Sequence, residues 1–141
     1  MDKDGIIEAE LFCDGASRGN PGNSGIGVVI SLLDGSDRDF RISEYIGIAT
    51  NNVAEYFALI RGLEEARSLG VRRVKVFLDS ELVVRQINGV YKVRNNTLKG
   101  LWSRARKILM DFDSYVVEHV KREKNMDADA LAGDAVMQKS R

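Results

Sequence analysis

The chain has 141 residues, of which 44% are hydrophobic and 30% charged, and its 21 basic and 21 acidic side chains give a net charge of zero. This composition is typical of a globular chain with its own core, so we expect a single domain over residues 1–141. The net charge of zero excludes a strong overall attraction to nucleic acid. A disulfide within the chain is excluded because Cys13 is the only cysteine, and a membrane span is excluded because no apolar run is long enough. Residues 1–10 also lack the pattern of a signal peptide, and we expect a cytoplasmic protein.

The first third of the chain predicts three strands that form an antiparallel meander. Residues 8–14 read as the first strand, and the Gly-rich segment 15–23 reads as a loop. Residues 25–33 are a β-branched run, and residues 39–48 alternate with period two after a DGSD hairpin signal. Leu11 and Cys13 share one face of the first strand, opposite Phe12, and the apolar positions of the third strand are Phe40, Ile42 and, after a slip, Ile46 and Ile48.

The rest of the chain alternates helices with strands. Hydrophobic spacing and turn signals predict a helix at 50–70, a strand at 71–79, a short helix at 80–89, a basic amphipathic helix at 97–112, a strand at 114–120 and a helix at 126–137. Asn52 and Asn125 are the expected N-caps of the first and last of these helices. The element order predicts an α/β fold with a five-stranded mixed sheet, three antiparallel strands and then parallel strands, flanked by helices on both faces.

Four carboxylates stand out by their positions in these elements. Asp14 and Asp79 each close a strand, Glu55 lies in the first turn of helix 50–70, and Asp129 lies near the start of the last helix. Ligands in open α/β sheets gather beyond the carboxyl ends of strands, so these acids can converge if their strands are neighbours. Clustered carboxylates need a compensating cation, and several oxygen ligands favour Mg²⁺ or Mn²⁺, with paired ions suited to cleavage of a phosphodiester.

Each acid also has a purely structural interpretation. Glu55 stands three residues after Asn52, which is the spacing of a capping box. Asp79 can cap the helix that follows it, and Asp129 can answer the dipole of the last helix. Asp14 begins an Asp-Gly pair that is common in turns, although a carboxylate directly after an apolar strand is costly without a partner. Spacing alone leaves these alternatives open.

Longer motifs connect the four acids to a known family. The chain resembles type 1 ribonuclease H over nearly its whole length, in the compact archaeal and bacterial form that lacks a basic protrusion. The pairing of DG-x-x-x-GNPG with TNN-x-x-E is much more specific than any single acid. The segments that carry the resemblance are DGASRGNPG at 14–22, TNNVAEYFALIRGL at 50–63, VFLDSELVVRQING at 76–89 and NMDADALA at 125–132.

The resemblance implies a monomeric enzyme that uses two Mg²⁺ ions, with Mn²⁺ as a substitute, to hydrolyse the RNA strand of an RNA/DNA hybrid. The products would carry 3′-hydroxyl and 5′-phosphate ends. By this resemblance Asp14 bridges both ions, Asp129 helps to hold one, and Glu55 and Asp79 hold the other. The matching positions that line the hybrid groove, or lie near a phosphate of the DNA strand, are Gly15, Ser17, Gly19, Asn20, Thr50, Asn51 and Asn52.

The sequence departs from this family pattern in the segment before the last acid. The loop that carries a histidine in many members is shortened to KREKN, and Arg122 is the candidate replacement, as a cation for a phosphate oxygen or as a solvated charge. The only histidine, His119, lies on a strand, where we favour a packing role. Some compact members also accept double-stranded RNA, which makes it a second possible partner.

Basic residues concentrate in the middle of the chain. Residues 61–107 hold 12 Lys/Arg and 4 Asp/Glu, which indicates a phosphate-binding face or an ordinary solvated helix surface. Glu81 adds a negative charge near the expected groove, and the spacing of Trp102 places it in the core rather than on a base-stacking surface. Without a protrusion, hybrid binding would depend on Arg85, Lys92, Arg94 and Lys99. The alternative function is a hybrid-binding module with the same fold and no catalysis.

Overall fold

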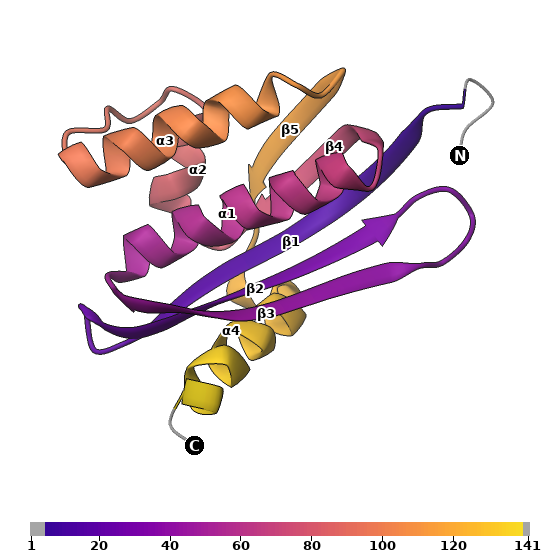
Figure 1. Ribbon diagram of the computed structural model, residues 1–141. Helices are drawn as coiled ribbons and strands as arrows, with labels where there is room; N and C mark the ends of the chain where they lie inside the picture. The colour runs from indigo at the N-terminus through magenta and orange to yellow at the C-terminus, as the bar shows by residue number, and fades with distance from the viewer. Residues whose placement is uncertain (1–4, 140–141) are drawn as a thin grey trace.

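The computed structural model describes residues 5–139, in which five strands form one mixed sheet in the order β3-β2-β1-β4-β5 (Figure 1). β1 pairs antiparallel with β2, and β2 pairs antiparallel with β3, while β4 lies parallel to both β1 and β5. The predicted mixed sheet is therefore confirmed. The strands are β1 (Ile7–Arg18), β2 (Gly22–Leu32), β3 (Asp39–Ala49), β4 (Val71–Leu78) and β5 (Ser114–His119).

Helices cover both faces of the sheet, as predicted. α1 runs along one face with α3 beside it, and α4 packs against the other face at one end of the sheet (Figure 1). No helix in the described part of the chain is long and apolar enough to cross a membrane. The helices are α1 (Asn51–Ser68), α2 (Glu81–Ile87), α3 (Asn96–Leu109), the short 3₁₀ helix η1 (Arg122–Lys124) and α4 (Met126–Lys139).

The main core lies between the sheet and α1. Leu11 and Cys13 are fully buried in it, whereas Phe12 lies on the opposite face and stacks on Phe77 of β4 with 4.9 Å between ring centroids. The predicted slip in β3 is present, because the pairing with β2 shifts between Ser24 and Gly25. The apolar pattern was wrong at one position, since Ile48 is 70% exposed beyond this bulge.

The Gly-rich segment differs from the prediction of a loop. β1 continues through Arg18 and pairs with β2 as far as Asn23, so only residues 19–21 remain as a turn. Gly15 is needed for close approach, because a Cβ there would lie 2.3 Å from the carbonyl carbon of Ala54 in α1. Gly15 is therefore required because a helix packs directly on the strand. Composition alone cannot distinguish this requirement from that of a turn.

Of the two predicted helix caps, Asn52 was wrong and Asn125 is correct in position only. Thr50, and not Asn52, caps α1, and its side chain accepts a hydrogen bond from the Val53 amide. Asn125 does precede α4, but its Oδ1 makes no hydrogen bond to any described residue. The side-chain cap of α4 is therefore absent.

Candidate metal centre

Parallel pairing of β1 and β4 brings Asp14 and Asp79 together. Cys13 is the register partner of Leu78, and each of these residues directly precedes one of the acids. Both strands run in the same direction, so the two carboxylates emerge at the same edge of the sheet. Asp14 is only 4% exposed, because β2 and α1 flank it as well.

Glu55 reaches this edge from α1. It is 7% exposed, and its Oε1 accepts a hydrogen bond from the Gly15 amide at 3.0 Å. Because Thr50 is the N-cap, Glu55 lies beyond the first turn of α1 and is not part of a capping box. Oxygen atoms of Asp14, Glu55 and Asp79 all lie within 4.8 Å of one another, so the convergence of these three acids was predicted correctly.

The electrostatics of this group call for a cation. Burial is the main cause that raises the pKa of Asp14, and the neighbouring carboxyl groups of Glu55, Asp129 and Asp79 raise it further. Burial also raises the pKa of Glu55, against the hydrogen bonds from Asp14 and Gly15. The Oε2 atom of Glu55 is buried with no hydrogen-bond partner among the described residues. An orphaned carboxylate oxygen among other acids fits a hard divalent cation with oxygen ligands.

Asp129 and Arg122 complete the wall of the site. The Asp129 carboxyl lies close enough to Asp14 to share a hydrogen bond, although it is outside the group of three mutually close acids. Arg122 Nη2 lies 3.4 Å from Asp129 Oδ2, and its side chain is 76% exposed. Both residues line an open hollow of about 410 Å³ together with Asp14, Gly15, Ala16, Ser17, Asn51 and Asp79. His119 lies exposed at the end of β5, so its predicted packing role was wrong.

A hydrogen-bonded network shapes the rim of this hollow. The Ser17 amide donates to Asn51 Oδ1 at 3.1 Å, and the Asn51 amide donates to Asn20 Oδ1 at 3.0 Å. Ser17 Oγ donates to the carbonyls of Gly19 and Ala49. The turn and the start of α1 are thereby held as one unit.

Three of the other predicted groove residues face a second hollow of about 580 Å³, whereas Gly19, in the turn between β1 and β2, lines neither hollow. Asn20, Thr50 and Asn52 line the second hollow, and Asn95 and Thr97 at the start of α3 form its far side. Sequence reasoning missed Asn95, whose only visible signal was its place as an N-cap, confirmed by the bond from the Leu98 amide at 3.0 Å.

Two basic residues of the segment 61–107 lie beyond this second hollow. Lys92 and Lys99 line a further hollow of about 340 Å³ beside Trp102. Trp102 packs partly buried against the core and donates to the Gln86 carbonyl at 2.9 Å, in agreement with its predicted core position. The charge of Glu81 is paired, because its Oε1 accepts from Arg85 Nε at 2.7 Å.

Comparisons with known proteins agree with this architecture. A family model described as "Reverse transcriptase-like" matches residues 12–135. The bifunctional protein Rv2228c of Mycobacterium tuberculosis is 44% identical over 131 residues, which are 93% of this chain. The chain spans only 35% of the length of that relative.

Solved structures extend the similarity to the whole described fold. RNase H1 from Halobacterium salinarum superposes with a TM-score of 0.86 at 39% identity, over 93% of this chain and 98% of that one. LC11-RNase H1 in complex with an RNA/DNA hybrid gives a TM-score of 0.83 at 42% identity, over 96% of this chain and 99% of that one.

Proposed function

This chain belongs to the ribonuclease H family, and from that premise we propose that it is a metal-dependent endoribonuclease acting on the RNA strand of RNA/DNA hybrids. The observation that carries the proposal is the group formed by buried Asp14 and Glu55 with partly buried Asp79, whose oxygens lie within 4.8 Å of one another at the edge of an open hollow. The hybrid held by LC11-RNase H1 supports the choice of substrate. The proposed products carry 3′-hydroxyl and 5′-phosphate ends.

We propose that Asp14, Glu55, Asp79 and Asp129 would hold two Mg²⁺ ions, for which Mn²⁺ can substitute. When bound, such ions supply a nucleophile at neutral pH and stabilise charge on the phosphate oxygens. The residues themselves explain why the site needs cations. Asp14 and Glu55 are buried, and the hydrogen bond from the Gly15 amide holds Glu55 beside Asp14, so negative charges would lie close together with little solvent around them.

The hollows next to the acids suggest a path for the substrate. Gly15, Ser17 and Asn51 flank the acids, where main-chain groups can approach the shallow minor groove of a hybrid and its 2′-hydroxyls. Thr50 and Asn52, with Asn95, form a polar site suited to a phosphate of the DNA strand. The path then continues past Leu98 to the basic side chains of Lys99 and Lys92.

Arg122 is the proposed replacement for the family's loop histidine. Its exposed guanidinium lines the hollow of the acids, so it can reach a phosphate oxygen by exchanging its contact with Asp129. Double-stranded RNA is a proposed second substrate, and a single monomeric domain over residues 1–141 is the proposed unit of function.

A non-catalytic hybrid-binding module is the alternative. A binding module has no use for buried, mutually repelling carboxylates beside a polyanion, and their repulsion weakens the hybrid's binding unless metal is present. The orphaned Oε2 of Glu55 therefore favours the enzyme.

The test is incubation with labelled RNA/DNA, RNA/RNA and DNA/DNA duplexes in Mg²⁺ or Mn²⁺. We expect cleavage of the RNA strand of the hybrid, and loss of cleavage in Asp14→Asn with the fold retained. Asp127→Asn is the matched control, because Asp127 is an exposed acid of α4 that does not line the hollow of the acids. Absence of hybrid cleavage with both ions would refute the proposal.

A further inference from the structure

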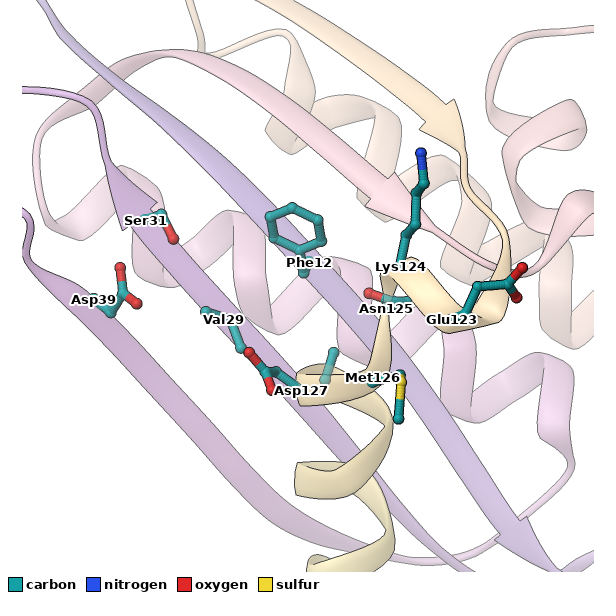
Figure 2. Close-up of a pocket in the computed structure, with 10 residues that line it drawn as sticks. Phe12, Val29, Ser31, Asp39, Glu123, Lys124, Asn125, Met126 and Asp127 are labelled. Carbon is teal, nitrogen blue, oxygen red and sulfur yellow. The ribbon is translucent and has the colours of Figure 1, made fainter.

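Asn125 occupies the junction between η1 and α4, and it is 1% exposed. Figure 2 shows it between the end of η1 and the first turn of α4, on the side that faces β1. Its main-chain N–H donates to the Arg122 carbonyl at 2.9 Å, and its main-chain carbonyl accepts from the Asp129 amide at 3.0 Å. Its main chain thus connects two residues that line the hollow of the acids.

The side chain of Asn125 makes a different kind of contact. Nδ2 donates to the carbonyl oxygen of Cys13 in β1 at 2.9 Å, in a fully buried hydrogen bond that spans 112 positions of the chain. Cys13 directly precedes Asp14. One side chain therefore connects the part of β1 that carries Asp14 to the segment that carries Arg122 and Asp129.

The unpaired oxygen of Asn125 indicates which part of the side chain matters. An N-cap asparagine normally accepts a helix amide through Oδ1, as Asn95 does from Leu98 at the start of α3. Asn125 Oδ1 is instead buried without a partner in the described part of the chain. Burying a polar atom without a hydrogen bond is unfavourable, so the compensating contact is the donor bond to Cys13.

Other contacts of α4 with the sheet are less suited to fix this relationship. Arg18 Nη2 of β1 contacts Met137 Sδ at 3.1 Å, but this contact is exposed and lies near the other end of the helix. Gly25 and Gly27 of β2 let backbone and Cβ atoms of α4 approach the strand closely, in a contact that carries no hydrogen bond. Ser43 Oγ donates to the Leu131 carbonyl at 2.7 Å, but this bond connects α4 to β3 and not to β1, which carries Asp14.

We propose that Asn125 is a positioning residue that sets Asp129 and Arg122 against Asp14 through its hydrogen bond to Cys13. The inference rests on the proposed function for its effect on catalysis. Its effect on the geometry of the acids does not depend on which substrate is cleaved. Residues that orient metal ligands from behind typically change metal affinity or activity by about 10–100-fold when removed.

A matched pair of variants tests the proposal in the full chain. Asn88 makes the same type of bond, from Nδ2 to the Val117 carbonyl at 2.9 Å, between α2 and β5 and away from the acids. We expect Asn125→Ala to lower kcat on the hybrid by about 10–100-fold with little change in KM. Asn88→Ala should retain the kcat of the unmodified chain. Equal kcat values for the two folded variants would overturn the proposal.

Calorimetric titration with Mn²⁺, without nucleic acid, separates this inference from the proposed function. Asn125→Ala should bind Mn²⁺ more weakly than the unmodified chain, and Asn88→Ala should bind it equally well. This comparison is decisive even if no hybrid is cleaved. Equal Mn²⁺ affinity in all three proteins would overturn the positioning role.

A measurement on the unmodified chain covers the case in which Asn125→Ala does not fold. We expect the side-chain amide protons of Asn125 to exchange slowly with solvent and their NMR signals to shift on addition of Mg²⁺. Rapid exchange, or signals that Mg²⁺ leaves unchanged, would show that the bond to Cys13 does not hold the site.

Discussion

Asp14 and Glu55 are the residues whose surroundings most restrict their chemistry. Each is a carboxyl group in a nearly dry environment, and burial is the main cause that raises the pKa of both. Their alternative structural interpretations fail for the same reason, because neither side chain caps a helix or faces solvent. A cation is the partner that these two side chains lack.

The first prediction concerns pH and metal together. The folded pKa of both carboxyls lies above the ordinary values of 3.8 and 4.5, so the protonated forms favour folding. That contribution is complete below the unfolded values and is lost as pH rises toward the raised pKa of each group. The free energy of unfolding of the metal-free protein should therefore fall from about pH 4 upward.

Urea titrations across pH, with and without Mg²⁺, check this prediction. Saturating Mg²⁺ should flatten the pH dependence, because an ion that binds only the folded state stabilises it. Asp14→Asn should also flatten it, whereas the exposed control Asp127→Asn should not. A flat profile in the metal-free unmodified chain would contradict the shared burial of the two acids.

The second prediction separates catalysis from stability at Arg122. Its contact with Asp129 is exposed, and such pairs contribute only about 0–1 kcal/mol. Arg122→Ala should lower kcat by about tenfold or more, as expected when a cation near a reacting phosphate is removed, with little change in the melting temperature. Arg41→Ala is the control, because Arg41 contacts Asp127 of α4 at 3.7 Å but does not line the hollow of the acids. An unchanged kcat in Arg122→Ala would leave η1 without a catalytic residue.

At the scale of elements, the packing of α4 against β2 determines the position of Asp129. A Cβ on Gly27 would stand 2.1 Å from the Ala128 carbonyl oxygen, which is part of the helix backbone and has little freedom to move. The helix and strand are thus in direct contact because both present small residues. This contact explains why Gly25 and Gly27 stand within the strand, on either side of Ile26.

The third prediction compares two Gly→Ala substitutions at this interface. Gly27→Ala should force α4 away from the sheet and destabilise the fold by about 1–3 kcal/mol or more, with loss of activity. Gly133 lies within α4 and has open space around its Cα, so Gly133→Ala should stabilise the helix by about 0.5–1 kcal/mol. Denaturant unfolding of both variants checks the pair. A tolerated Gly27→Ala would mean that α4 can sit further from β2.

At the scale of the whole molecule, the chain has no net charge, but its acidic and basic side chains gather in different places. The acids gather at one edge of the sheet, while Lys92 and Lys99 lie along the α2–α3 segment beside the polar site of Thr50 and Asn95. The net charge of zero therefore says little about affinity for nucleic acid, which depends on the local arrangement.

The fourth prediction uses this separation. Hybrid binding should weaken as salt increases, and Lys92→Ala should reduce the slope of log affinity against log salt by about one. Lys75 in β4 lies beside Tyr115 and Val116, away from the proposed path, so Lys75→Ala should leave the slope unchanged. Binding measured in Ca²⁺ with Asp14→Asn avoids cleavage during the titration. Equal slopes in all variants would remove Lys92 from the substrate path.

Local patterns along the chain were enough to predict the order of the elements, the mixed sheet and the four acids. Period-two and helical spacing are local properties, and strands that end in an acid mark positions where a carboxylate is expensive to bury without a partner. The motifs around Asp14, Glu55, Asp79 and Asp129 then pointed to one family, and the fold confirms it.

The contacts between these elements became known from the fold. It showed that Gly15 belongs to a strand pressed against α1, that Thr50 caps α1, and that Asn125 bonds to Cys13 instead of capping α4. A glycine or an asparagine permits several local structures of similar energy. Contacts between residues far apart in the chain select among them, and local sequence does not record those contacts.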